Sequence, residues 1–130
     1  MPTLHKQTVG QTGERIAENY LRFRGYKIIG RNVRTFFGEI DIIARHAATI
    51  VFIEVKTLTT DEPAMPLYSI TEDKKTKLIQ NALSYMKQMH CRGKRFRIDA
   101  IGINLDISGK AKMIKHIRGA VNMEGSYLDY

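Results

Sequence analysis

An acidic residue and a lysine share one face of an otherwise apolar segment, where they could bind a cation or stabilise a developing negative charge. Residues 49–57, TIVFIEVKT, are rich in β-branched side chains and predict a strand. Successive side chains of a strand point to opposite faces, so Glu54 and Lys56 share one face. The other face is apolar and carries Val51, Ile53 and Val55. Two interpretations remain open, an ion pair on a solvated face or part of a charged site.

A second predicted strand, residues 37–44 (FGEIDIIA), repeats the pattern. Strict alternation puts Glu39, Asp41 and Ile43 on one face, and Ile40 and Ile42 on the other. Only residues 45–48 separate the two strands, which predicts an antiparallel hairpin with Asp41 and Glu54 on one face. Facing carboxylates repel each other unless a proton or a cation lies between them. Such an all-oxygen site suits Mg²⁺ or Mn²⁺ and does not suit zinc.

A third carboxylate comes from the helix predicted over residues 11–24. On a helical wheel, Glu14 borders the apolar stripe that contains Ala17 and Leu21, which places it near the protein interior. The alternative is an acidic residue favoured at this position by the helix dipole alone. Glu18 lies nearby and competes for the same role.

Composition favours a soluble protein with a polyanionic partner. The chain has 130 residues, which predicts a single domain over 1–130. Its 21 Lys and Arg against 13 Asp and Glu give a net charge of +8, which favours nucleic acid because neutralised phosphates release counterions. No signal peptide or apolar run of membrane-spanning length is evident, and the single cysteine, Cys91, allows no internal disulfide. We therefore expect a cytoplasmic protein with no membrane partner.

The remaining elements complete an α/β pattern. Strands are predicted over 26–34, 95–105 and 113–118, and a long helix follows Thr71, which is a suitable N-cap. Between residue 57 and this helix lies a loop of about a dozen residues, a length typical of binding loops and lids. The order α-β-β-β-α-β-β predicts a central mixed β-sheet flanked by helices.

Five segments together resemble the YraN-like bacterial family over roughly residues 10–120. They are GQTGERIAENYL, RNVRTFFGEIDIIA, IVFIEVKT, SITEDKKTKL and RFRIDAIGI. The pairing of GEID with EVK thirteen residues later is the most specific part, since an isolated E-x-K is common. That family is described as predicted nucleases, similar to archaeal Holliday-junction resolvases and the PD-(D/E)XK superfamily. The resemblance implies a restriction-endonuclease-like αβββαβ core.

The resemblance also implies site roles. Asp41 and Glu54 look like the superfamily's metal ligands, and Lys56 looks like the lysine that positions the attacking water or stabilises the scissile phosphate. Glu14 looks like the first-helix glutamate that completes the catalytic and metal site. The basic signature of the family falls on Lys74, which has further lysines beside it. The expected nucleic-acid-binding residues are Lys74, Lys75, Lys77 and Arg34.

Two positions depart from the family pattern. Leu58 replaces a basic residue that usually follows EVK, and residues 46–48 replace a common Asp-Gly turn. Neither change removes a proposed ligand. We therefore expect a nuclease that uses Mg²⁺ or Mn²⁺ to hydrolyse DNA, with resolvase-like structure specificity. The alternative is a non-catalytic nucleic-acid-binding protein of the same fold. Resolvase-like relatives act as dimers, which implies a homodimer, although the sequence identifies no self-complementary surface.

Other residues have structural interpretations. Arg97 and Asp99 share a face of the strand over 95–105 and predict an ion pair that braces the sheet. The four histidines lie in unrelated segments, with no ligand spacing, and predict packing or surface roles. Phe36, Phe37 and Tyr68 predict core or lid packing, with stacking on bases as the alternative.

Overall fold

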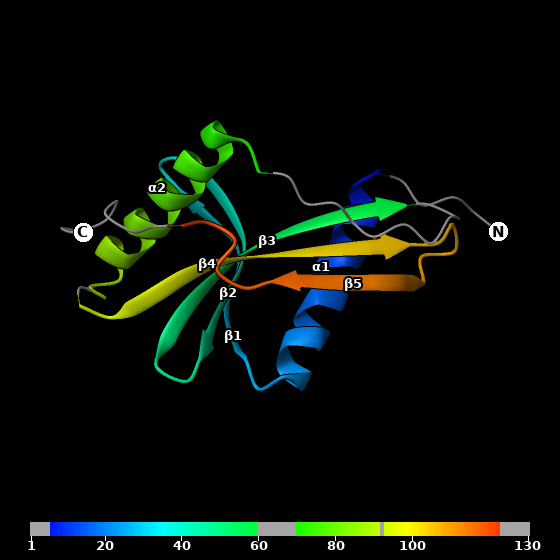
Figure 1. The fold of residues 1–130 in the computed structure, drawn as a ribbon, viewed down its shortest axis with the longest axis horizontal. Helices are drawn as coiled ribbons and strands as arrows, with labels where there is room; N and C mark the ends of the chain where they lie inside the picture. Colours follow the sequence, from blue (N-terminus) through cyan, green and yellow to red (C-terminus); the bar gives the residue numbers. More distant parts are fainter. Residues whose placement is uncertain (1–5, 60–69, 92, 123–130) are drawn as a thin grey trace.

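The helices and strands of the described residues follow each other in the order that the sequence predicts. The computed structural model describes residues 6–59, 70–91 and 93–122. The elements are α1 (Lys6–Phe23), β1 (Lys27–Thr35), β2 (Gly38–His46), β3 (Thr49–Thr59), α2 (Glu72–Gln88), β4 (Arg95–Leu105) and β5 (Ala111–Ile117). Figure 1 shows α1 crossing behind β3, β4 and β5, with α2 towards the opposite end of the molecule.

One mixed sheet contains all five strands in chain order, from β1 at one edge to β5 at the other. Every neighbouring pair is antiparallel except β3 and β4, which run parallel. Parallel neighbours need a crossover connection, and the segment that contains α2 supplies it. The predicted α/β fold with a mixed sheet and flanking helices is therefore confirmed, as is the antiparallel β2–β3 hairpin.

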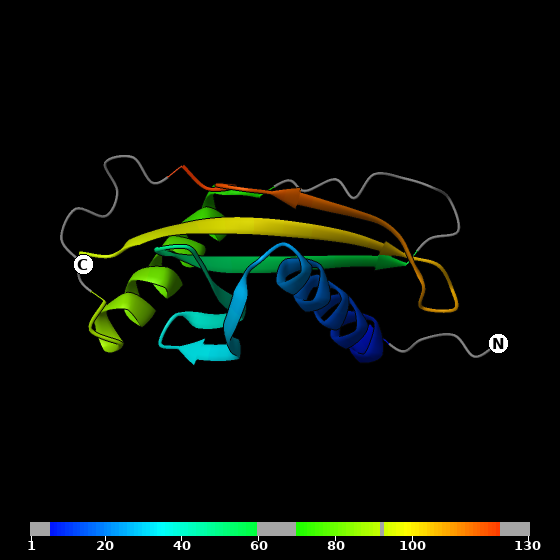
Figure 2. The ribbon, with the colours of Figure 1, turned by 90° about the horizontal axis from the view of Figure 1, so that it is seen from below.

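Helix α1 packs on one face of the sheet. Its buried Ala17 and Leu21 join a core formed largely by alternate residues of β2, β3 and β4. Gly13 makes a close approach possible, because a Cβ at this position would collide with the side chain of Thr57 on β3. Figure 2 shows α1 against β3 and β4, with the β1–β2 hairpin between the two helices. This contact fixes the position along β3 at which the next residue, Glu14, approaches the sheet.

Helix α2 packs on the other face through Leu78, Ala82 and Met86. Its N-cap is Thr71, as predicted, whose side chain accepts a hydrogen bond from the backbone N–H of Lys74 at 3.2 Å. Glu72 and Asp73 in the first turn complement the positive end of the helix dipole. The cap and these acids explain why the helix begins here, and Lys74 of its first turn contacts Glu54 on β3.

Strand β2 does not keep the strict alternation that the sequence suggested. Ile40 packs in the α2-side core together with Ile43, whereas Ile42 packs in the α1-side core. The predicted shared face of Ile40 and Ile42 is therefore wrong. The physical reason is that pairing of β2 with β3 runs only from the turn to Ile42 and Ile53. Beyond Ile42, β2 is paired with β1 alone, and the chain changes face at Asp41.

Element boundaries differ from the predictions mostly at the ends. Helix α1 begins at Lys6, five residues before the predicted start, and β5 begins at Ala111. Strand β3 continues to Thr59, so the predicted loop starts later, and most of it, with Tyr68, lies outside the described residues. Within the ranges that the structure describes, none of the helices is long and apolar enough to span a membrane.

Candidate functional site

Asp41 lies where β2 separates from β3. One carboxylate oxygen, Oδ2, accepts a hydrogen bond from the backbone N–H of Val55 at 2.8 Å. In a continuous antiparallel ladder, a backbone carbonyl would accept this kind of bond. The side chain thus takes the place of a strand partner, and it is only partly buried. This arrangement fixes the carboxylate of Asp41 beside the middle of β3.

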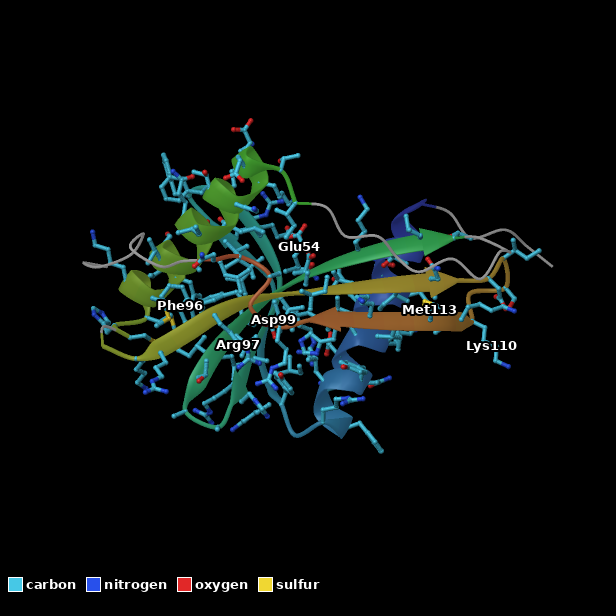
Figure 3. All side chains as sticks on the ribbon, in the orientation of Figure 1. Glu54, Phe96, Arg97, Asp99, Lys110 and Met113 are labelled. Carbon is cyan, nitrogen blue, oxygen red and sulfur yellow. The ribbon has the colours of Figure 1, made fainter. Side chains whose placement is uncertain are left out.

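Glu54 lies on the α2 side of β3, as the alternation with Phe52 predicts. Figure 3 shows Glu54 near the middle of the molecule, well away from Lys110 at the far end of the sheet. Its Oε1 forms an ion pair of 2.9 Å with Nζ of Lys74 from the first turn of α2. The Glu54 side chain is 16% exposed and that of Lys74 49% exposed. Lys74 therefore compensates part of the charge of Glu54.

Glu14 approaches the same region from α1 through an amide on β1. With its nitrogen facing the acids, the side-chain amide of Asn32 donates to Oε1 of Glu14 at 3.1 Å and to Oε1 of Glu39 at 3.2 Å. Asn32 has a φ of 47°, a left-handed conformation that asparagine adopts more readily than most residues. Glu18, the competing residue, instead pairs with Arg22 and Arg31. Of the two acids on α1, Glu14 is therefore the one that approaches the site formed by Asp41 and Glu54.

Electrostatics couples these acids. The pKa of Asp41 is raised to about 7, chiefly by burial and also by the charges of Glu54 and Glu14, against the lowering effects of the Val55 N–H and Lys74. Burial also raises the pKa of Glu14, as do the charges of neighbouring acids including Glu54, while the Asn32 hydrogen bond lowers it. Burial first, and repulsion between neighbouring acids second, thus raise the pKa values of both Asp41 and Glu14.

The donor set suits a hard divalent cation in its chemistry, because it consists of carboxylate oxygens. The described residues nevertheless contain no group of three or more Asp, Glu, His or Cys side chains arranged to hold a metal ion. Each acid is engaged elsewhere, Asp41 with Val55, Glu54 with Lys74 and Glu14 with Asn32. Mg²⁺ commonly binds through one or two carboxylates and water, so Asp41 and Glu54 fit such a site, and a three-carboxylate cage is not assembled. The metal roles stay a prediction.

The basic residues predicted to bind nucleic acid surround the acids without forming one patch. Lys56 is exposed and lies one pleat beyond Glu54 on the same strand. Lys75 pairs with Glu72 at 3.2 Å, and Arg34 lies 3.9 Å from Glu39. Lys77 is exposed. The structure thus brings Lys74 into the acidic site itself and leaves Lys56 at its rim, and nucleic-acid binding by these residues stays a prediction.

Sequence reasoning missed the polar residues that support the site. Asn32 and Asn81 come from separate elements, and the side-chain carbonyl of buried Asn81 accepts a hydrogen bond from the hydroxyl of Thr35 on β1. An asparagine inside a predicted strand is the one sequence signal that pointed to Asn32.

The packing role predicted for Phe36 is wrong, since its side chain is 93% exposed at the β1–β2 turn. At this two-residue turn its ring meets only the edge of Phe37 among the described aromatic side chains, with the centroids 5.3 Å apart.

The predicted ion pair on β4 is confirmed and belongs to a larger network. Nε of Arg97 donates to Oδ1 of Asp99 at 2.9 Å. Sequence reasoning gave His116 only a packing or surface role, yet its Nε2 lies 2.8 Å from Oδ2 of Asp99. Burial opposes ionisation of Asp99, but hydrogen bonds from His116, Arg97 and Gly119 hold its pKa below the usual value.

Comparison with known proteins places the chain in a family. Residues 13–103 match the model of the uncharacterised protein family UPF0102. A UPF0102 protein of Desulfosudis oleivorans is 40% identical over 115 residues, which is 88% of this chain and 90% of that protein. Another, from Geobacter metallireducens, is 37% identical over 121 residues, 93% of this chain and 98% of that protein.

Among solved structures, Pyrococcus furiosus SfsA in complex with Ca²⁺ matches 89% of this chain and 64% of its own, with a TM-score of 0.41 and 17% identity. That likeness is too distant to bear on function. The family match and the curated relatives, by contrast, cover most of the chain and confirm the YraN-like resemblance seen in the sequence. This chain therefore belongs to the uncharacterised protein family UPF0102.

Proposed function

We propose that this protein is a metal-dependent nuclease that hydrolyses phosphodiester bonds in DNA, with a preference for branched or otherwise irregular structures. The observation that carries the proposal is the position of Asp41, whose carboxylate lies between two separating strands and is coupled electrostatically to Glu54 and Glu14. A purely structural acid at such a place would be expected to have a neutralising partner of its own. Asp41 instead shares its surroundings with other acids.

Each residue of the site has a definite task in this proposal. The backbone N–H of Val55 fixes one oxygen of Asp41, which leaves the other oxygen free to face a ligand. Lys74 holds Glu54 in place, and the exposed ammonium group of Lys56 is available to a phosphate one pleat away. A divalent cation held by Asp41 and Glu54 would polarise the phosphoryl group and favour ionisation of the attacking water. Lys56 would stabilise the charge that develops on the phosphate.

Substrate attraction follows from the overall charge. The chain carries a net charge of +8, and Arg34, Lys75 and Lys77 lie on elements next to the acidic site. The ion pairs of Arg34 and Lys75 are exposed, so exchange of their carboxylate partners for phosphate is inexpensive. These residues would position a polyanion without selecting its sequence.

A second candidate function is nucleic-acid binding without hydrolysis. The ion pair between Lys74 and Glu54 favours it, because a neutralised Glu54 is a poorer cation ligand. In this alternative, the acids and lysines form a regulated surface for nucleic acid, and no cation is needed. The two functions share a substrate class and differ in whether the bond is cleaved.

A cleavage screen with matched variants separates them. Linear, flapped and four-way DNA would be incubated with wild type, Asp41→Asn and Lys56→Ala in Mg²⁺, in Mn²⁺ and in chelator. Asp73→Asn serves as the control, since this acid is exposed on α2. We expect metal-dependent cleavage by wild type and Asp73→Asn, and its loss in the other two. Binding without cleavage in wild type would establish the alternative, and cleavage that survives Asp41→Asn would exclude this site.

A further inference from the structure

An open pocket lies on the α1 side of the sheet, between the end of α1 and the edge strand β5. Its volume is about 680 Å³, which is within the range of small-molecule sites. The last turn of α1 and the residues just after it form one wall, the end of β2 contributes His46, and β5 contributes His116. It shares no lining residue with the acidic site around Asp41 and Glu54.

The walls of this pocket are fixed by a buried acid. Asp99 is fully buried and accepts hydrogen bonds from Arg97 Nε at 2.9 Å, from His116 Nε2 at 2.8 Å and from the backbone N–H of Gly119 at 3.0 Å. On the other side of the ring, Nδ1 of His116 shares a hydrogen bond of 3.2 Å with the hydroxyl of Tyr20. The imidazole of His116 is therefore held at a set orientation.

The same network fixes the aromatic floor. Nη2 of Arg97 donates to the hydroxyl of Tyr26 at 2.6 Å. The ring of His46 stacks on Tyr26 with the centroids 4.1 Å apart and the planes within 7° of parallel. Figure 3 shows Arg97 and Asp99 near each other on β4. Because Arg97 and Asp99 satisfy each other, the floor is rigid and presents flat rings.

Positive charge enters the pocket from two arginines. Arg24 and Arg118 line it, and neither has a carboxylate within ion-pair distance among the described residues. The guanidinium group of Arg24 lies 4.9 Å from the centre of the Tyr20 ring, which holds it over the pocket. Every lining residue is basic or aromatic. Guanidinium groups bind phosphate through paired hydrogen bonds, so the pocket selects anions.

An exposed ring completes the set. Phe23 lines the pocket, yet its side chain is 92% exposed. Its ring is therefore accessible to a ligand in the pocket, and nucleobases stack readily on aromatic rings. Rings beside arginines that form no ion pair with a carboxylate among the described residues match a ligand that contains a flat base and a phosphate.

We infer that this pocket binds a nucleotide unit, in which a sugar links a phosphoryl group to a nucleobase, supplied by a free nucleotide or by a single strand of nucleic acid. Arg24 and Arg118 contact the phosphoryl group, and Phe23 stacks on the base. The site is separate from the proposed nuclease site and does not require that function. The two sources share one chemistry, and they differ in whether the ligand continues beyond one nucleotide.

The test measures binding in chelator, where no metal-dependent reaction takes place. The probes are AMP, adenosine, inorganic phosphate, a 5′-phosphorylated pentathymidylate and an abasic oligonucleotide of equal length. The variants are Phe23→Ala and the double variant Arg24→Ala with Arg118→Ala. Lys110→Ala is the control, because this exposed lysine lies at the far end of the sheet (Figure 3). All changed residues are exposed, and thermal melts confirm that each variant folds.

We expect wild type to bind AMP, the pentathymidylate or both more tightly than adenosine, phosphate or the abasic strand. The double variant should lose at least tenfold in affinity, Phe23→Ala should lose severalfold, and Lys110→Ala should match wild type. AMP binding identifies a free nucleotide, and binding of the pentathymidylate alone identifies a strand. Equal affinity of the abasic strand, unchanged affinity in the double variant, or no binding of either nucleotide probe would overturn the inference.

Asp41→Asn makes failure of this inference distinguishable from failure of the proposed nuclease. That variant should bind the probes as wild type does, because Asp41 does not line the pocket. If cleavage is lost but the probes still bind, the inference about the pocket stands. If cleavage is intact but no probe binds, only the inference about the pocket fails.

Discussion

Replacing Asp41 by Asn should stabilise the protein at alkaline pH in the absence of metal. The pKa of Asp41 is raised from its ordinary 3.8 to about 7, first by burial and then by Glu54 and Glu14. Between these values, the folded state binds a proton that the unfolded state has released, so the free energy of unfolding falls as pH rises from about 4 to 7. The difference corresponds to about 4 kcal/mol, an upper value for the cost of the ionised group.

Asparagine at position 41 can keep the hydrogen bond to Val55 without the negative charge. Its side-chain oxygen can still accept from the backbone N–H of Val55, as Oδ2 of Asp41 does at 2.8 Å. At pH 8 we therefore expect Asp41→Asn to be more stable than wild type by roughly 2–4 kcal/mol. At pH 5, where Asp41 is mostly protonated, the two proteins should have similar stabilities.

Urea unfolding in chelator at several pH values measures this directly. The difference between variant and wild type isolates Asp41, because other titrating groups cancel. Asp73→Asn, an exposed acid on α2, should follow the wild-type profile. Mg²⁺ or Mn²⁺ should stabilise wild type at pH 8 and leave Asp41→Asn unchanged. A stability difference that is equal at pH 5 and pH 8 would refute the idea that the site carries uncompensated charge.

Three further outcomes are expected. Lys74→Ala should weaken DNA binding and also raise the pKa of Asp41, because the lysine forms an ion pair of 2.9 Å with Glu54 and lowers the pKa of Asp41. The higher pKa should appear as a higher midpoint in the pH dependence of stability. Gly13→Ala should destabilise the fold by about 1–3 kcal/mol in urea, and Thr57→Ala should recover part of this loss, since the added Cβ collides with Thr57. Asp99→Asn should destabilise the fold by about 3–5 kcal/mol above pH 5. The loss should be smaller at low pH, because hydrogen bonds lower the pKa of Asp99 and their stabilising effect disappears as its carboxylate is protonated. Melting curves from pH 3 to 7 measure the last effect, and a constant difference would contradict it.

The strands and the second helix were predictable because each has a local signal. Residues 49–57 are β-branched and alternate, and strand β3 begins at the predicted Thr49. Thr71 marks the start of α2 by its capping side chain. The start of α1 was not predictable to the same degree, since residues 6–10 lack the apolar repeat on which the prediction depends. Local patterns thus locate elements better than they locate ends.

The acids of the site were identifiable from spacing, but their partners were not. Asp41 and Glu54 stand out because each interrupts an apolar strand. Lys74 was expected to meet phosphate, and the structure pairs it with Glu54 across the gap between α2 and β3. That contact depends on how the helix packs, which no periodicity encodes. The bridge that Asn32 makes from Glu14 to Glu39 also depends on tertiary structure.

The His116–Asp99 contact shows the same limit in a sheet. Arg97 and Asp99 lie two residues apart on one strand, so their ion pair follows from alternation. His116 reaches Asp99 only because β5 pairs with β4 in a register that sets His116 opposite Ile101. A turn one residue longer would shift that register and turn His116 to the other face. Sequence spacing between the two residues therefore carries little information.

Asp41 itself shows where structural and functional explanations part. Its hydrogen bond to Val55 explains why an acceptor stands at this point of β2, since the separating strand leaves a backbone N–H to satisfy. That need does not explain a negative charge, because an amide oxygen would satisfy the same N–H without repulsion from Glu54 and Glu14. The charge raises the free energy of the folded protein at neutral pH, as the pKa of about 7 indicates. A cation or proton taken up at Asp41 removes that penalty, which is why the site is expected to act on a bound ion or substrate and not to serve as a strand support alone.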